Sequence, residues 1–299
     1  MNPRTPPWPD IDDAISGSLG RPFATREITP VAGGCISTAV VISSEDQRFF
    51  VKLNSASRLQ MLEAEADGLA EIAGTHTVRV PSVVCAGTAG SYAFLVLEYL
   101  HLCRPGFRAA ESLGSNLARM HSEVQAYFGW RRDNTIGATP QPNERCSSWP
   151  DFFRRFRLQH QLTLTRRTHR RIRGLQSKGE RLCENLDDYF TGYTCYPSLL
   201  HGDLWSGNFS ALADDEPVVF DPAVYFGDRE TDIAMTELFG GFDAGFYQAY
   251  SAMLPLDAGY EVRRDLYKLY HVLNHFNLFG GGYAAQAENL MDRLLAELG

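Results

Sequence analysis

The sequence predicts an α+β protein of two lobes, a small sheet-rich N-terminal lobe and a larger, mainly helical C-terminal lobe. At 299 residues, 44% of them hydrophobic, the chain is long enough for two units of roughly 150 residues each. Short β-like runs separated by Gly and Pro fill the first third, and apolar residues spaced three and four apart dominate after about residue 109. We therefore expect residues 1–100 and 101–299 to form two lobes with a cleft between them.

Individual elements follow from the same patterns. Residues 39–43, 48–53 and 93–99 are β-like runs, which predict a mainly antiparallel sheet. Between them, residues 57–73 have the apolar spacing of an amphipathic helix, and residues 149–164 predict a helix in the second lobe. Two short β-like runs, 198–200 and 218–220, interrupt the helical part. Each of them leads into an acidic residue.

Charge and targeting signals narrow the possible partners. With 36 acidic and 28 basic residues, the formal charge of −8 would repel a nucleic-acid backbone, so we expect a small substrate and no nucleic acid. The N-terminus lacks the apolar segment of a secretion signal, and no run reaches the roughly 18 apolar residues of a membrane span. These features predict a cytoplasmic protein with no membrane partner.

Two further groups of residues receive no function. The six cysteines, at positions 35, 85, 103, 146, 183 and 195, have no metal-binding spacing, so we expect free thiols. An arginine cluster would spread around a helix and is either a solvated surface or an anion-contacting one. Its members are Arg166, Arg167, Arg170, Arg171 and Arg173.

The octet His-Gly-Asp-Leu-Trp-Ser-Gly-Asn at 201–208 carries the clearest chemistry. Asp203 precedes Asn208 by five positions, which is the spacing of a kinase catalytic loop. Asp203 would accept the proton of a substrate hydroxyl, while Asn208 and Asp221 would offer oxygen ligands to Mg²⁺. We interpret His201 as a brace for the backbone of this loop rather than as a catalytic base.

A lysine and a glutamate would anchor the phosphates of ATP. Lys52 ends the run 48–52, as a strand-borne lysine does when it reaches the α and β phosphates. Such a lysine is held by a carboxylate on the neighbouring helix. At about 100° per residue, Glu65 lies roughly 60° from the centre of the apolar stripe and Glu63 roughly 100° from it. Glu65 is therefore the predicted partner.

Two more segments complete a nucleotide site. A glycine turn between two β-like runs would cover the phosphates with its amides. A connector after the last strand would present the backbone of Glu98 and Leu100 to adenine. The turn consists of Gly33, Gly34, Cys35, Ile36 and Ser37. Cys35 there would be partly exposed among amide donors that favour a thiolate, which makes reactivity a hypothesis.

With these residues in place, the chain resembles the fructosamine kinase (ketosamine 3-kinase) family, within the larger group of aminoglycoside and choline kinases. The resemblance runs over nearly the whole chain, and Asp-Leu-Trp-Ser-Gly-Asn at 203–208 is its most specific part. The other landmarks are residues 34–37, 51–54, 63–65, 80–81, 97–100, 149–153, 157–159, 221–223 and 274–276.

The resemblance implies a bilobal protein-kinase-like fold and ATP-dependent phosphorylation of the C3 hydroxyl of a ketosamine, a step that promotes loss of the sugar from a glycated amine. It also implies that Trp205 forms a wall of the sugar site and that His275 lines it. The cysteine of the glycine turn is linked in this family to redox-sensitive dimerisation, so the chain is expected to be a monomer or a redox-dependent homodimer through Cys35.

Some residues depart from the family pattern. Residues 143–148 (Asn-Glu-Arg-Cys-Ser-Ser) differ from the aromatic and acidic residues that are usual there, which leaves the choice of substrate open. Asp221-Pro222-Ala223 replaces Asp-Phe-Gly, so a phosphorylated activation loop is not expected.

Three other functions remain as alternatives. An aminoglycoside- or choline-type phosphotransferase would use the same catalytic and phosphate-binding residues. A nucleotide-binding pseudokinase with a redox-sensing role would bind ATP through them without turnover. A metal hydrolase would use His201, Asp203 and Asp221, and would leave Lys52 and the glycine turn unexplained.

Overall fold

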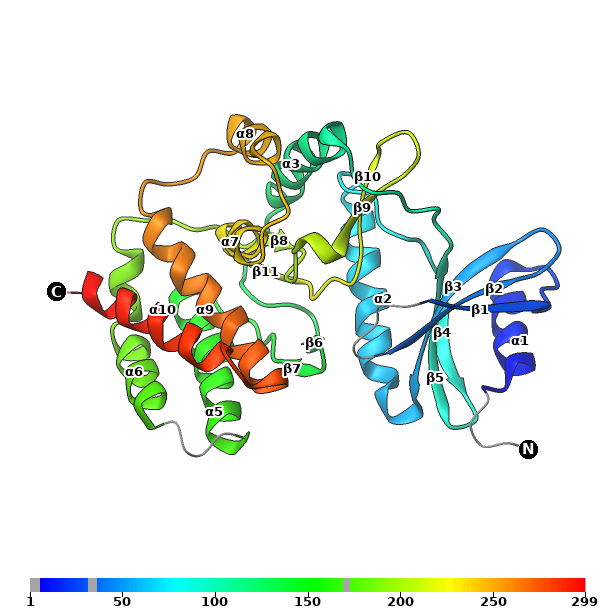
Figure 1. Cartoon of the computed structure of the whole chain (residues 1–299), viewed down its shortest axis with the longest axis horizontal. Coiled ribbons are helices and arrows are strands. Elements are labelled where there is room, and N and C mark those ends of the chain that lie inside the picture. Colours follow the sequence, from blue (N-terminus) through cyan, green and yellow to red (C-terminus); the bar gives the residue numbers. More distant parts are fainter. Residues whose placement is uncertain (1–5, 32–36, 169–172, 299) are drawn as a thin grey trace.

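A five-stranded antiparallel sheet forms one end of the molecule (Figure 1). The structure is a computed structural model that describes residues 6–31, 37–168 and 173–298. The strand order is β1-β2-β3-β5-β4. In β3, buried side chains alternate with more exposed ones, because successive side chains of a strand point to opposite faces. The strands are β1 (Glu27–Val31), β2 (Thr38–Ser43), β3 (Arg48–Ser55), β4 (Val83–Ala89) and β5 (Tyr92–Glu98).

Two helices cover the two faces of this sheet. Helix α1 (Trp8–Leu19) packs with Phe49, Val51 and Leu53 of β3 in one hydrophobic core. Helix α2 (Leu59–Gly74) packs on the other face, where its apolar side chains join a second core that continues into the helical part. The alternation along β3 therefore places Lys52 on the same face as α2.

In the residues that the structure describes, the rest of the chain is mainly helical, with three small two-stranded sheets. In the described residues, no helix is long and apolar enough to cross a membrane. The helices are α3 (Phe107–His121), α4 (Trp149–Phe153), α5 (Gln159–Thr168), α6 (Arg173–Glu184), α7 (Glu230–Leu238), α8 (Ala244–Met253), α9 (Tyr260–Phe279) and α10 (Tyr283–Glu297). The small sheets pair β6 (Asn134–Ile136) with β7 (Thr139–Gln141), β8 (Ser198–Leu200) with β11 (Tyr225–Gly227), and β9 (Phe209–Ala211) with β10 (Pro217–Val219).

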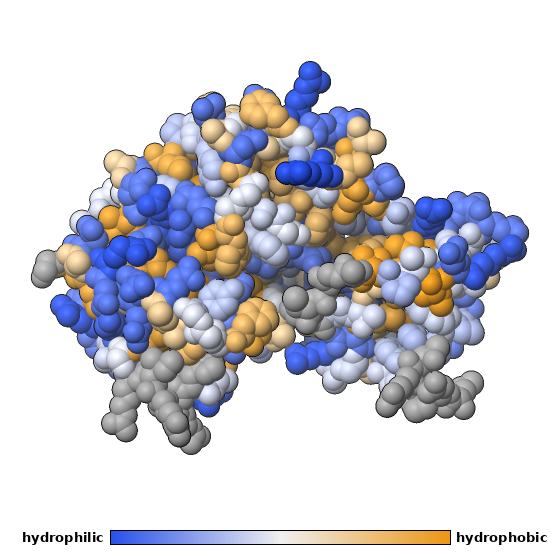
Figure 2. Space-filling model, in the orientation of Figure 1, coloured by the Kyte–Doolittle hydropathy of each residue, from blue (hydrophilic) through white to orange (hydrophobic). Residues whose placement is uncertain are grey.

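Backbone contacts join the sheet part to the helical part. Cys103, between β5 and α3, donates its N–H to the carbonyl of Ala211 with an N to O distance of 2.7 Å. Ala211 donates its N–H to the carbonyl of Cys103 at 3.2 Å. Val219 donates its N–H to the carbonyl of Arg79 at 3.0 Å. On the face shown in Figure 2, the outline of the molecule narrows between the two parts. We propose that the boundary near residue 100 lies in this connector.

The predicted α+β fold, with its antiparallel sheet and larger helical part, is confirmed. The helix predicted for residues 149–164 is confirmed, but it continues to Thr168 and contains a π-helical turn, Arg154–Leu158, between α4 and α5. This turn directs the fully buried Arg157 into the core, where its guanidinium lies 4.0 Å from the ring centre of Tyr225. A π turn adds one residue to a helical repeat, and apolar spacing in the sequence does not reveal it.

Candidate active site

The loop after β8 is braced by a buried histidine. The Nε2 of His201 lies 3.1 Å from the carbonyl of Phe220, and its Nδ1 lies 3.3 Å from the backbone nitrogen of Asp203. These contacts fit a neutral ring that donates from Nε2 and accepts at Nδ1. Burial lowers the pKa of His201, which favours this neutral form. The ring therefore ties the loop of Asp203 to the end of β10.

Gly202 allows the loop that carries Asp203 to lie close to the loop that carries Asp221. Its φ is +82°, and a Cβ atom at this position would lie 2.1 Å from the carbonyl oxygen of Ala223. The N–H of Ala223 donates to the carbonyl of His201 at 2.8 Å. Only glycine combines this backbone conformation with such a close approach. The segments that carry Asp203 and Asp221 consequently lie against each other.

Asn208 closes the predicted catalytic loop, residues 201–208, onto Asp203. Its Nδ2 donates to the backbone carbonyl of Asp203 at 2.8 Å and lies 3.4 Å from the Oδ2 of the same residue. Because the amide nitrogen is used in this way, the Oδ1 of Asn208 remains as an acceptor. Burial raises the pKa of Asp203 to about 7, and the charges of Asp221 and Asp232 add to the shift.

Lys52 lies between two carboxylates from distant parts of the chain. Its Nζ is 2.5 Å from Oε1 of Glu65 on α2 and 2.6 Å from Oδ1 of Asp221. The side chain of Lys52 is only 11% exposed. Burial alone would lower its pKa, but the two carboxylates hold the pKa above its ordinary value. The structure thus pairs Lys52 with Glu65, and it places Glu63 elsewhere, 3.9 Å from Arg132.

Asp221 and Asn208 offer a donor set that suits Mg²⁺. Asp221 has a φ of +57°, a conformation uncommon outside glycine and concentrated at functional sites. Its side chain is 49% exposed, so it remains accessible beside Lys52. No group of three or more His, Cys, Asp or Glu among the described residues could hold a metal ion. A Mg²⁺ ion here would need the Asn208 oxygen and the phosphates of ATP to complete its ligands.

Asp232, on α7, supports the catalytic loop and was not predicted from the sequence. Its Oδ2 accepts the N–H of His201 at 2.7 Å, and its Oδ1 accepts the N–H of Gly202 at 2.9 Å. Burial would raise the pKa of Asp232, but the hydrogen bond from His121 and the other donors lower it. The only signal in the sequence is the acidic run after 225–227, which also fits an ordinary helix start.

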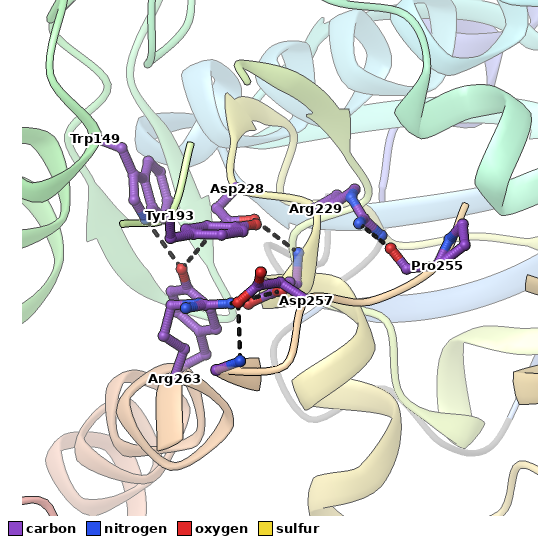
Figure 3. Close-up of polar contacts among 10 residues, drawn as sticks. Trp149, Tyr193, Asp228, Arg229, Pro255, Asp257 and Arg263 are labelled. Atoms are coloured by element: carbon purple, nitrogen blue, oxygen red, sulfur yellow. Dashed lines mark hydrogen bonds and ion pairs between the residues drawn. The ribbon is translucent and has the colours of Figure 1, made fainter. Parts of the chain in front are cut away.

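The start of α7 is held by a second polar network (Figure 3). Asp228, just before α7, accepts hydrogen bonds from Tyr267 at 2.6 Å and from Tyr193 at 3.0 Å. Arg263 of α9 binds Glu230 at 2.7 Å and lies over the ring of Tyr193 at 3.6 Å. This network fixes α7 against α9, and it thereby fixes Asp232 under the catalytic loop.

An aromatic cluster extends from the catalytic loop to α9 and α10. Trp205 is 37% exposed and meets Phe239 edge-to-face at 6.0 Å between ring centres. Phe239 in turn lies 5.0 Å from His275, whose ring also contacts Phe279 and Tyr283. The Nδ1 of His275 lies 2.8 Å from the carbonyl of His271, and burial lowers the pKa of His275. Trp205 and His275, predicted as substrate residues, are therefore joined through Phe239.

The other residues predicted for the nucleotide site belong to the glycine turn and to the connector after β5. The glycine-turn residues Gly33, Gly34, Cys35 and Ile36 lie outside the described residues, and Ser37 accepts a hydrogen bond from Asn54 at 3.1 Å. The carboxylate of Glu98 binds Arg79 at 2.6 Å, and the N–H of Glu98 donates to Ser82 at 2.8 Å. The contact of adenine with the backbone of Glu98 and Leu100 stays a prediction.

The model of the fructosamine kinase family matches residues 7–297. The chain belongs to this family. A probable ketoamine kinase of Synechocystis is 47% identical over 290 residues, which cover 97% of each chain. A chloroplastic protein-ribulosamine 3-kinase of Arabidopsis thaliana is 42% identical over 284 residues, which cover 93% of this chain and 86% of the relative.

Solved structures share the fold. A Haemophilus somnus crystal structure, described as a candidate fructosamine-3-kinase, has a TM-score of 0.88 at 30% identity and covers 95% of this chain and 96% of its own. Aminoglycoside phosphotransferase APH(4)-Ia has a TM-score of 0.61 at 13% identity over 96% of this chain and 98% of its own. The second likeness shows the protein-kinase-like fold alone.

The carboxylates of Asp203 and Asp232 should have opposite effects on stability. A raised pKa of Asp203 means that the folded state binds a proton more tightly than the unfolded state, so its contribution falls as pH rises from about 4 to about 7. We expect Asp203→Asn to raise the free energy of unfolding by about 1–3 kcal/mol at pH 8, and by less at pH 5.

Asp232→Asn is the matched comparison. Its lowered pKa stabilises the fold above about pH 4 and this contribution is lost as pH falls further, so the substitution should destabilise by about 2–4 kcal/mol at pH 8 because it disturbs a buried acceptor. Urea unfolding of both variants at the two pH values measures this. A loss of stability at pH 8 in Asp203→Asn would contradict the assigned environment.

Proposed function

We propose that this chain transfers the γ-phosphoryl group of ATP to the C3 hydroxyl of ketosamines. The observation that carries the proposal is the convergence of Asp203, Asn208 and Asp221 with Lys52, the residue types that phosphoryl transfer requires. The names of the relatives, ketoamine kinase and protein-ribulosamine 3-kinase, support a ketosamine as the acceptor.

Each residue has a separate part in this reaction. Lys52, held by Glu65, would bind the α and β phosphates, and the glycine turn would cover them. Asn208 and Asp221 would hold Mg²⁺, which neutralises charge on the transferring phosphates. Asp203 would accept the proton of the C3 hydroxyl while the new O–P bond forms and the bond to ADP breaks. A pKa near 7 suits a base that works at neutral pH.

The aromatic cluster supports the assignment of the acceptor side. Trp205 follows Asp203 by two residues and is 37% exposed, so part of its surface is accessible for contact with a sugar. The lowered pKa of His275 favours a neutral ring, and its Nδ1 is directed to a backbone carbonyl. In that form its Nε2 is a hydrogen-bond acceptor for a hydroxyl or an ammonium group. Phosphorylation at C3 would then promote loss of the sugar and release the repaired amine.

The alternative acceptors have less support. The likeness to aminoglycoside phosphotransferases rests on 13–14% identity, while relatives with 40–47% identity are named for ketoamines or ribulosamine. A pseudokinase usually lacks one of the lysine or acidic residues of the site, whereas this chain has all of them. These residues are Lys52, Glu65, Asp203, Asn208 and Asp221. A cytoplasmic location and a redox-dependent dimer through Cys35 remain parts of the proposal that rest on the sequence and the family resemblance.

A coupled assay of ADP release, with ATP and Mg²⁺ present, tests which acceptor the protein phosphorylates. Fructosyl- and ribulosyl-amines are compared with an aminoglycoside and with choline. We expect turnover on the ketosamines, and a loss of about 10²–10⁴-fold in Asp203→Asn because the general base is removed. Phosphorus NMR of the product should locate the phosphate on C3. Turnover of the aminoglycoside alone, or equal rates in the variant, would refute the proposal.

The pH dependence tests the role of Asp203 separately. Because the carboxylate form is the base, kcat/KM should rise by about tenfold per pH unit below pH 7 and level off above it. The measurement uses saturating Mg²⁺ and initial rates between pH 5.5 and 8.5, with fold monitored by circular dichroism at each pH. A flat profile, or activity that falls as pH rises through 7, would exclude Asp203 as a base with this pKa.

A further inference from the structure

Helix α2 has a second polar face besides the one that carries Glu65. Gln60, Glu63, Asp67 and Glu71 follow one another at steps of three and four, so they share one side of the helix. A loop segment between α3 and β6, residues 130–132 (Trp-Arg-Arg), contacts this side. We call the contact between the two the arginine clasp.

Asp67 is the centre of the arginine clasp. Its Oδ2 lies 2.6 Å from Nη1 of Arg132, and its Oδ1 lies 2.8 Å from Nη2 of Arg131. One carboxylate thus binds two guanidinium groups, each through a different oxygen. Burial opposes ionisation of Asp67, but the hydrogen bonds from Arg132 and Arg131 keep its pKa below the ordinary value. The clasp is therefore charged at neutral pH.

Two further hydrogen bonds connect the loop segment 130–132 to α2. Trp130 is 3% exposed, and its Nε1 donates to Oε2 of Glu71 at 3.2 Å. Arg132 also donates from Nη2 to the backbone carbonyl of Gln60 at 3.3 Å. Trp130 and Arg132 hence contact α2 at two points about three turns apart, which opposes both sliding and rotation of the helix.

The clasp is tied to the loop that carries Asp221. Asn143 donates to the carbonyl of Arg132 at 3.2 Å and to Oδ1 of Asn134 at 2.9 Å. Asn134 donates in turn to the carbonyl of Val224 at 2.8 Å. On α2 itself, a Cβ atom at Gly68 would lie 3.1 Å from Cγ2 of Val224. The residues just after Asp221 are therefore in contact with α2 directly and connected to it through the clasp.

We propose that Arg132, assisted by Arg131, is a positioning residue for phosphoryl transfer. It holds α2 against the helical part so that Glu65 directs Lys52 toward Asp221. The inference rests on the proposed role of the Lys52–Glu65 pair in binding phosphates. Arg132 is the main member because its side chain is 30% exposed, against 49% for Arg131. Isolated surface ion pairs contribute little stability, so the expected effect is on geometry.

The test compares Arg132→Ala with Arg293→Ala, whose guanidinium binds Asp265 at 2.8 Å and joins α10 to α9 away from the clasp. Arg132→Ala should lower kcat/KM for ATP by about 10- to 100-fold, because small displacements of catalytic groups have effects of this size. Arg293→Ala should stay within twofold of wild type, and both should show similar melting temperatures. Arg132→Lys should restore part of the loss.

A double-mutant cycle with Glu65→Gln separates positioning from general destabilisation. If Arg132 acts through Glu65, adding Arg132→Ala to Glu65→Gln should cost less than about threefold, since the two losses are then not additive. A full multiplicative loss in the double variant, or Arg132→Ala activity within twofold of Arg293→Ala, would overturn the proposal. If Arg132→Ala does not fold, Asp67→Asn is measured in the same cycle with the same expectations.

Nucleotide affinity keeps this test independent of the acceptor. Binding of a non-hydrolysable ATP analogue with Mg²⁺ is measured by calorimetry for all variants. Weaker binding in Arg132→Ala than in Arg293→Ala, without further weakening in the Glu65→Gln background, supports the clasp even if wild type fails to phosphorylate ketosamines. Equal affinity in Arg132→Ala and Arg293→Ala, together with equal kcat/KM wherever turnover is measurable, refutes it.

Discussion

The ammonium group of Lys52, held between Glu65 and Asp221, is the interaction on which the rest of the site depends. It joins three segments that are far apart in the sequence: strand β3, helix α2 and the loop after β10. The alternation of β3 turns Lys52 toward α2, and the angular position of Glu65 on α2 turns its carboxylate toward the sheet. The same contact reaches Asp221, so the sheet and the catalytic loops have a shared fixed point.

Around this point the fold concentrates acidic groups, and their environments differ. Burial and neighbouring carboxylates raise the pKa of Asp203, whereas hydrogen-bond donors lower the pKa of Asp232. The first environment destabilises the carboxylate form of Asp203. The carboxylate therefore takes up a proton more readily, as a general base near neutral pH must. The second stabilises a charge whose task is to hold the backbone of His201 and Gly202. Reactivity and support are thus assigned to different carboxylates.

Several residues of the site could be predicted because their positions follow from short stretches of sequence. The spacing of Asp203 and Asn208, the strand position of Lys52 and the helix angle of Glu65 depend only on neighbouring residues. The contacts of Asp232 and of the arginine clasp could not be predicted, since they depend on packing between segments 31 to 111 residues apart in the chain. The π turn at Arg157 could not be predicted either, because one extra residue in a helical turn hardly changes the spacing of apolar residues.

A crystal structure with Mg²⁺ and a non-hydrolysable ATP analogue tests the central role of Lys52 most directly. We expect the ammonium of Lys52 to contact an α- or β-phosphate oxygen while it keeps its ion pair with Glu65. We expect the Oδ1 of Asn208 and the carboxylate of Asp221 to coordinate the metal. Phosphates bound away from Lys52, or a metal held by other side chains, would contradict it.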